Sequence, residues 1–173
     1  PKPITTIYFL DHAGSAQTGY VGLTDGSIYR STDRGVTWSA VGSVAGRVNG
    51  FAFKDAETGW CASNTDLWRT TDGGLSWTDV LSTGVVYSVT YVPVSDLVVA
   101  VDPTYARQSR DGGITWSQIN TRPALHLYPE FFGQNGAING VGGSNELYTT
   151  DAGASWFAGA SSPLRQCWQL HAL

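Results

Sequence analysis

The chain has 173 residues, which is long enough for one domain with a hydrophobic core. Its formal net charge of −4, without any run of basic residues, argues against nucleic-acid binding, and no apolar stretch approaches the roughly 18 residues of a membrane-spanning helix. The 21 glycines and 7 tryptophans, together with only 14% charged residues, are typical of an all-β protein.

Strand-like segments follow one another along the whole chain. They are rich in β-branched and aromatic residues and are separated by clusters of turn residues. Residues 98–101 are continuously apolar, which is typical of a strand buried on both faces. No helix is predicted. The expected strands span 4–11, 18–24, 27–32 and 36–41, then 48–54, 58–63, 66–71 and 75–80, then 85–92, 96–101, 105–109 and 114–119, and in the last quarter 124–132 and 136–141.

One short phrase, Ser/Thr-x-Asp-x-Gly-x-Ser/Thr-Trp, occurs four times, at 31–38, 70–77, 109–116 and 149–156. Its tryptophans are 39, 39 and 40 residues apart. A period of about 40 residues filled with strand-like sequence predicts a β-propeller or a similar array of sheets. We therefore expect a single domain, 1–173, with four blades at about 3–42, 46–82, 84–120 and 123–159.

The repeated phrase contains the residues that a hairpin turn needs. Its aspartate can accept hydrogen bonds from nearby backbone N–H groups, and its glycine can adopt a positive φ. The hydroxyl residues can tie the two arms together, and the tryptophan can cover the turn and bury about 150–250 Å². The predicted structural residues are Asp33, Gly35 and Trp38, then Asp72, Gly74 and Trp77, then Asp111, Gly113 and Trp116, and finally Asp151, Gly153 and Trp156.

The phrase resembles the Asp box, or BNR repeat, of sialidase-like β-propellers, and the resemblance extends over all four repeats. The sequence around 7–11 and 18–22 is most similar to the non-enzymatic branch, which includes photosystem II assembly and stability factors and secreted bacterial repeat proteins. The resemblance implies four-stranded antiparallel blades, with each Asp box at the outer rim between the third and fourth strands. It also implies a non-catalytic, extracellular or exported module for protein–protein interaction or structural assembly.

Sialidase-type glycoside hydrolysis is the catalytic alternative. It needs an arginine cluster for the substrate carboxylate, a Tyr–Glu nucleophile pair and an acid. Arg47, Arg122 and Arg165 stand near the starts of predicted first strands. There they could also bind an anion or a partner on the axial face, or simply be solvated at the rim. Glu130, close to Tyr128, is the one glutamate suited to the nucleophile pair. Because the set is incomplete, no catalytic residue is assigned and a non-enzyme is expected.

A carbohydrate-binding module is a further alternative, in which an exposed Trp60 or Trp68 stacks on a sugar. No metal or cofactor is expected, because the histidines lack a third ligand at sensible spacing and no phosphate-binding glycine loop precedes a helix. Cys61 and Cys167 are too few for a disulfide framework and are interpreted as small buried hydrophobes.

Residues 164–172 have the character of the first strand of a fifth repeat. Three arrangements remain open. The chain can be a fragment of a larger propeller, a closed four-bladed ring with its tail outside, or a subunit whose last strand pairs with blade one of another copy. The third arrangement predicts a homo-oligomer, as a ring or a filament. The chain also begins with Pro1 rather than Met, as expected for a processed or trimmed product. The candidate assembly residues are Leu164, Cys167, Trp168 and Leu170.

Overall fold

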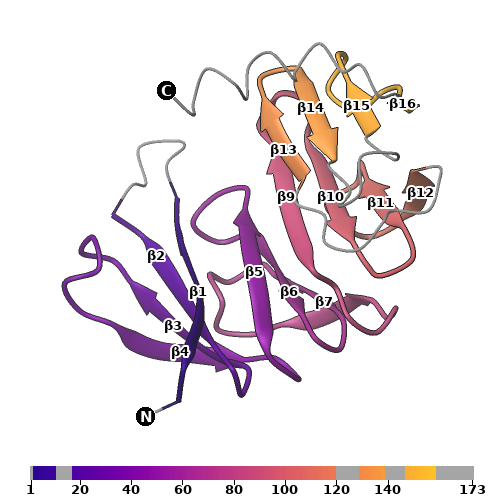
Figure 1. Cartoon of the computed structure of the whole chain (residues 1–173). Helices are drawn as coiled ribbons and strands as arrows, with labels where there is room; N and C mark the ends of the chain where they lie inside the picture. The colour runs from indigo at the N-terminus through magenta and orange to yellow at the C-terminus, as the bar shows by residue number, and fades with distance from the viewer. Residues whose placement is uncertain (1, 11–16, 120–128, 139–146, 159–173) are drawn as a thin grey trace, which may run out of the picture.

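The computed structural model describes residues 2–10, 17–119, 129–138 and 147–158. These residues form four antiparallel sheets of four strands each, and every sheet is made of consecutive strands (Figure 1). We call the sheets blades one to four. Blade one contains β1 (Ile4–Phe9), β2 (Gly19–Leu23), β3 (Ser27–Ser31) and β4 (Ser39–Ser43), and blade two contains β5 (Val48–Phe53), β6 (Gly59–Ser63), β7 (Leu67–Thr70) and β8 (Thr78–Leu81). Blade three contains β9 (Ser88–Val92), β10 (Leu97–Val101), β11 (Ala106–Ser109) and β12 (Ser117–Ile119), and blade four contains β13 (Pro129–Phe132), β14 (Asn135–Ile138), β15 (Leu147–Thr149) and β16 (Phe157–Ala158).

The blades lie side by side in chain order. The first strands of successive blades contact one another, β1 with β5, β5 with β9 and β9 with β13. Figure 1 shows this succession from β1 at the lower left to β13 at the upper right. In each blade the strand order follows the sequence, so the first strand lies on the inner side of the arc and the fourth strand at its outer edge. The all-β fold class and the four-stranded antiparallel blades are therefore confirmed.

The Asp boxes occupy the turns between third and fourth strands, as predicted, but the fourth strands begin later than expected. β4, β8 and β12 start after the box tryptophan, so the predicted starts at Val36, Leu75 and Ile114 were wrong. The reason is chemical. The second hydroxyl residue of each box donates its backbone N–H to the box aspartate, which keeps this stretch in the turn. The three apolar residues before it are exposed.

Other strand limits differ by smaller amounts. The strand predicted to begin at 85 starts at Ser88, and most other strands are one or two residues shorter than predicted. A short 3₁₀ turn, η1 (Pro93–Ser95), stands where no helix was expected, and Asp96 ends it with a φ of 49°. The expected strand segments 124–128 and 139–141 and the tail 164–172 lie outside the described residues.

The hydrophobic core lies between the blades rather than at one centre. Three clusters of buried side chains occupy the three junctions between successive blades. In the first junction Tyr20 stacks on Phe53 with ring centroids 4.0 Å apart, and in the second Trp60 stacks on Tyr91 at 5.7 Å. Cys61 is buried in the first cluster, as predicted, and all four residues of the apolar run 98–101 are buried. Each blade therefore depends on its neighbour for cover.

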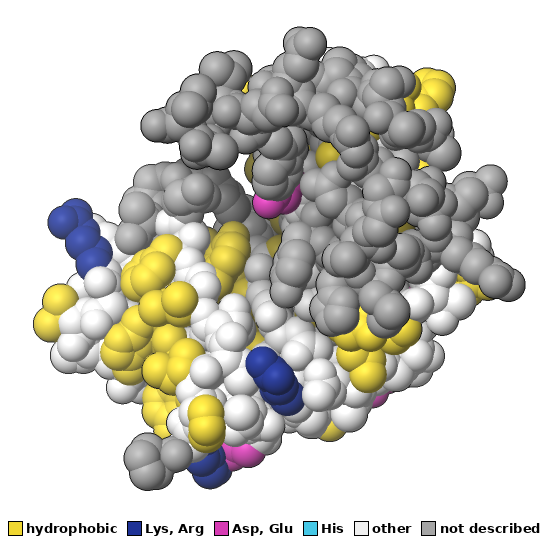
Figure 2. Space-filling model, viewed as in Figure 1, with side chains coloured by type: hydrophobic (Ala, Val, Ile, Leu, Met, Phe, Trp, Pro, Cys, Tyr) yellow, Lys and Arg dark blue, Asp and Glu magenta, His cyan; other side chains and the backbone are white. Residues whose placement is uncertain are grey.

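The outside of blade one is apolar. Figure 2 shows hydrophobic side chains gathered over this blade, at the left of the view.

No helix in the described part of the chain is long and apolar enough to cross a membrane.

Candidate functional site

Each Asp box is a closed set of hydrogen bonds. In the second box the Thr70 hydroxyl donates to Asp72 Oδ1 over 2.8 Å and accepts the Gly74 N–H over 2.9 Å. Ser76 donates its N–H to Asp72 Oδ1 over 2.9 Å and its hydroxyl to Asp72 Oδ2 over 2.5 Å. The same four contacts recur in the other three boxes. The aspartate is thus held by its own turn, as the sequence predicts.

These donors favour the ionised carboxylate. The hydroxyl of the second Ser or Thr has the largest effect, followed by the backbone N–H of the same residue. Together they lower the pKa of Asp33, Asp72 and Asp151 to about 2, and the same donors lower the pKa of Asp111 well below its usual range. A carboxylate with such a low pKa cannot serve as a general acid near neutral pH. The boxes are structural turns.

The box tryptophan does more than cover its own turn. Trp77 donates its indole N–H to Gly74 O over 3.0 Å, and its ring meets Phe53 edge to face at 6.3 Å. It also packs into the junction cluster that contains Tyr20 and Val41 of blade one. The sequence did not reveal this role, because Tyr20 and Val41 lie in the preceding repeat and no signal within one repeat identifies them.

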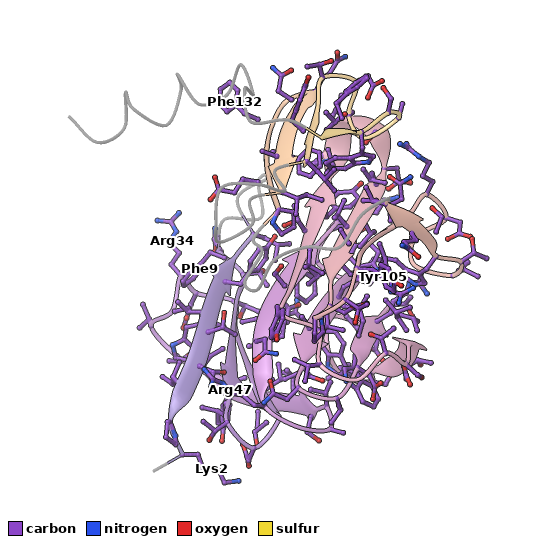
Figure 3. The ribbon with its side chains drawn as sticks, turned by 45° about the vertical axis from the view of Figure 1, so that its right-hand side comes forward. Lys2, Phe9, Arg34, Arg47, Tyr105 and Phe132 are labelled. Atoms are coloured by element: carbon purple, nitrogen blue, oxygen red, sulfur yellow. The ribbon has the colours of Figure 1, made fainter. Side chains whose placement is uncertain are left out.

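The side of blade one that faces away from blade two has no covering blade among the described residues. The strand registers place Phe9 where blade two has Phe53, and Ile7 where blade two has Phe51. Phe9 is 38% exposed and Ile7 59%, whereas Phe53 and Phe51 are 0% and 6% exposed. Figure 3 shows Phe9 and Arg34 near the edge of the molecule. The same position in the repeat is buried in blade two and open in blade one.

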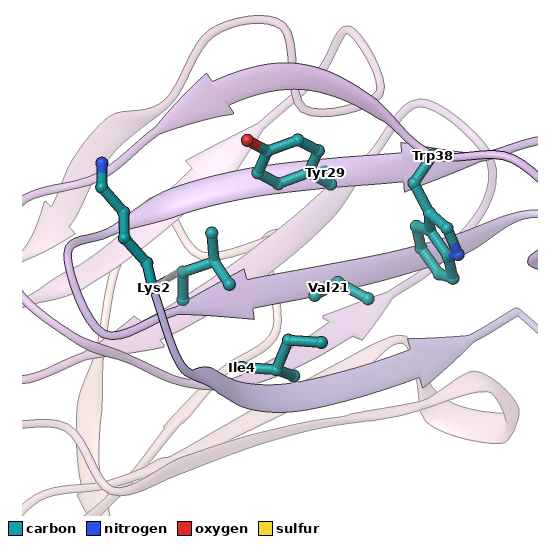
Figure 4. A pocket seen from close by; sticks show the side chains of 6 residues that line it. Lys2, Ile4, Val21, Tyr29 and Trp38 are labelled. Atoms are coloured by element: carbon teal, nitrogen blue, oxygen red, sulfur yellow. The ribbon is translucent and has the colours of Figure 1, made fainter.

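A groove runs along this open side. It measures about 370 Å³ and is lined by apolar side chains with one cation, Lys2, at its end (Figure 4). Lys2 forms an ion pair with Asp25, outside the groove lining. Ile4, which lines the groove, is 66% exposed, although its counterpart Val48 is fully buried. We call the following residues the open face: Ile4, Ile7, Phe9, Val21, Leu23, Tyr29 and Trp38.

The open face suits contact with another apolar surface better than catalysis. Among the described residues, its lining offers no carboxylate and no histidine. Sequence analysis did not single it out, because the first strand of blade one has the same apolar character as the buried first strands of blades two and three. Only the three-dimensional arrangement shows which of these faces is uncovered.

The residues considered for hydrolysis do not form one site in the described part of the chain. Arg47 is exposed immediately before β5, and Glu130 is exposed in β13. Figure 3 shows Arg47 in the lower part of the molecule and Phe132 of β13 at the top. Outside the described residues lie Arg122, Tyr128, Arg165 and the candidate assembly residues Leu164, Cys167, Trp168 and Leu170.

The tryptophans considered for sugar stacking are not both available. The interpretation of Trp60 as exposed was wrong, because its side chain is fully buried and stacks on Tyr91. Trp68 is half-buried and donates its indole N–H to Ser63 Oγ over 3.1 Å. Within the described ranges, no group of His, Cys, Asp and Glu side chains could hold a metal ion.

Comparison with known proteins supports the repeat and the fold. Residues 29–40 match the family model described as BNR/Asp-box repeat. No curated protein sequence matches the chain at a significant level.

Three similar solved structures are an ancestral GH74 enzyme, YCF48 from Cyanidioschyzon merolae, and YCF48 bound to D1 peptide. The GH74 enzyme has a TM-score of 0.74 and 18% identity, over 94% of this chain and 24% of the enzyme. The two YCF48 structures have TM-scores of 0.68 and 0.62 and identities of 18% and 15%, over 93% and 91% of this chain and 57% and 53% of theirs. The chain thus spans about a quarter of the enzyme and slightly more than half of YCF48, and at these identities the likeness shows the fold alone. Residues 29–40 thus match an Asp-box repeat, and the four sheets are arranged as the blades of a β-propeller.

Proposed function

We propose that the chain is a non-catalytic propeller module that binds protein, and that it associates with further copies of itself through its terminal blades. The observation that carries this proposal is the exposure of Ile4, Ile7 and Phe9 at positions of the repeat that other blades bury. An apolar patch of this kind on a folded protein marks an interaction surface. One similar structure, YCF48 bound to D1 peptide, is a propeller of this type with a peptide partner, which supports a protein partner in general.

The physical driving force is the removal of the open face from water. Complete burial of one large aliphatic or aromatic side chain is worth about 1.5–3 kcal/mol. The three first-strand side chains of the open face are only partly buried, so covering them would recover a substantial part of this value for each. The expected location, outside the cell or in an exported compartment, is supported only by the resemblance to secreted repeat proteins.

The test is the oligomeric state of the intact chain, measured by sedimentation velocity across a wide concentration range. We expect concentration-dependent association of the natural chain. Ile7→Asp should abolish it, because a carboxylate would be carried into an apolar contact. Val36→Asp is the matched control, since Val36 is also an exposed apolar residue but lies at the tip of the first box, outside the open face. A natural chain that stays monomeric at every concentration would contradict self-association.

The catalytic alternative has a separate test. Turnover of a fluorogenic sialoside or a β-glucan, lost in Arg47→Ala, would contradict the non-catalytic proposal. The expected outcome is no turnover by either protein.

A further inference from the structure

A contact between successive blades recurs at one position of the repeat. In the first three blades, the residue just before the first Ser or Thr of the Asp box extends from the third strand toward the Asp box of the next blade. Arg30 lies against Gly73, where an added Cβ would stand 2.7 Å from the arginine Nη1. Arg69 lies near Gly112, where an added Cβ would stand 3.8 Å from Nη2. An arginine at this position thus meets a glycine on the facing turn.

The third junction uses the same two positions with other residues. Here the third-strand residue is Gln108, and its Oε1 accepts the indole N–H of Trp156 in the next blade over 3.1 Å. The facing turn residue is Ala152, which is buried. In the first two junctions an arginine on the third strand therefore faces a glycine in the turn. In the third junction the shorter glutamine faces a turn that carries alanine.

The two terminal blades depart from this pattern in complementary ways. At the third-strand position blade four has Tyr148, and at the turn position blade one has Arg34. Arg34 has a φ of 65° and donates its N–H to Gln17 O over 3.0 Å, as Gly73 donates to Glu57 O over 2.9 Å, so the turn is the same. The Arg34 side chain is exposed where a blade docked on the open face would place its third-strand residue.

As the third-strand residue that would face Arg34, a tyrosine is favourable and an arginine is not. Two guanidinium groups would repel each other, whereas a guanidinium packs favourably on an aromatic ring within about 6 Å of its centroid. The chain already uses this contact twice, with Arg30 Cζ 5.9 Å from the Tyr20 ring and Arg107 Cζ 5.3 Å from the Tyr105 ring.

The outward side of blade four carries exposed apolar side chains beside one carboxylate, Glu130, which the strand registers place in the same row as Tyr148. Phe132 is 88% exposed, and it corresponds in register to Leu10 and Val92, which the next blade buries, and to the exposed Lys54 of blade two. Phe157 is half-exposed and lies beside Tyr148, with ring centroids 5.5 Å apart. The strand pairing puts Phe132, Tyr148 and Phe157 on the same side of the sheet. The exposed aromatic side chains on this side therefore suit contact with the open face and with Arg34.

We propose that two copies of the chain dock head to tail, with the outward side of blade four of one copy on the open face of the other, so that Tyr148 lies over Arg34. This inference rests on the proposed function and names its partner and contact. This contact between copies has the same arrangement as the junction between blades one and two. Tyr148 takes the third-strand position of Arg30, and Arg34 takes the turn position of Gly73. It joins two different surfaces, so successive copies either close into a ring or extend into a filament.

The test exchanges the pair in the intact chain and measures association by sedimentation velocity. Tyr148→Arg places an arginine opposite Arg34 and should weaken association at least about ten-fold. The double variant Tyr148→Arg/Arg34→Gly recreates the internal Arg30–Gly73 pair and should restore association to within a few-fold of the natural chain. Arg110→Gly is the matched control, because Arg110 is an exposed box arginine on blade three and should have no effect. Thermal melts of the dilute monomers check that each variant folds.

The outcomes separate this inference from the proposed function. Association that is sensitive to Ile7→Asp but unchanged in Tyr148→Arg would overturn the head-to-tail contact and leave self-association standing. A double variant as weak as Tyr148→Arg alone would also overturn it. A monomeric natural chain would overturn both, and would leave the open face to another protein or to further blades of a longer chain.

Discussion

The carboxylate of each Asp box is stabilised as an anion by the donors of its own turn. Asp72 accepts from a threonine hydroxyl, a serine hydroxyl and a backbone N–H, and its pKa falls to about 2. In the unfolded chain an aspartate has a pKa of about 3.9. Folding therefore favours the ionised form of this residue, and the same applies to the other three boxes.

The first prediction follows from this difference in pKa. The stabilisation is fully present above the unfolded pKa, near pH 4, and is lost as the pH falls through about 2. The Tm should thus fall steeply between about pH 4 and pH 2. Asp72→Asn keeps the shape but has no charge to lose, so it should have a lower Tm at pH 7 and a shallower fall. Circular dichroism melts from pH 7 to pH 2 measure both effects, and a natural chain with a constant Tm over the acid range would contradict them.

At the scale of the element, the blade is not an independent unit. Its apolar side chains are buried by the neighbouring blade, and the Asp box contributes to that burial. Trp77 lies in the junction between blades one and two, whereas Trp38, at the same position of its repeat, lines the groove on the open face. The two tryptophans make the same bond within the turn, from the indole N–H to a glycine carbonyl over 3.0 Å.

The second prediction compares these two tryptophans. Trp77→Ala should cost about 3–5 kcal/mol of unfolding free energy, because it opens a cavity in a packed junction. Trp38→Ala should cost clearly less in dilute protein, since it removes the turn contact without a junction. Urea unfolding of both variants at low concentration measures the difference. Equal losses would mean that stability comes from the turns and not from contact between blades.

At the scale of the whole molecule, four blades stand in a row with apolar surfaces at both ends. Ile7 on the first blade is exposed where blades two and three bury Phe51 and Val89, and Phe132 on the last is exposed where blade three buries Val92. In the described part of the chain, no first-strand contact between β1 and β13 is as extensive as those between successive blades. Among the described residues, the two terminal faces therefore do not cover each other.

The third prediction concerns the coupling of association to stability. Whatever binds the folded chain and not the unfolded chain raises the Tm by mass action. The Tm of the natural chain should rise with protein concentration, whereas that of Ile7→Asp should not. Calorimetry at two concentrations about 100-fold apart tests this, since such a ratio changes the binding term by up to about 2.7 kcal/mol. A Tm of the natural chain that does not depend on concentration would contradict the coupling.

The sequence by itself determined the local chemistry. The four boxes, their turn hydrogen bonds and the strand order of the blades follow from residues that lie within a few positions of one another. Asp33 meets Ser31 and Thr37 in any copy of this phrase, so a pattern of eight residues is enough to predict the turn. The sequence pattern did not predict where the fourth strands begin. They begin after the box tryptophan, because hydrogen bonds of the box keep the preceding residues in the turn.

The tertiary structure decided everything that depends on two repeats meeting. Trp60 and Trp68 both lie in strands of blade two, but the packing of blade two against blade three buries Trp60 completely. The contact of Arg30 with Gly73 joins residues of different repeats, and no pattern within one repeat predicts it. The open face is the clearest case. β1 is as apolar in sequence as β5, and only the position of blade one at the end of the row leaves Ile7 exposed while Phe51 is buried.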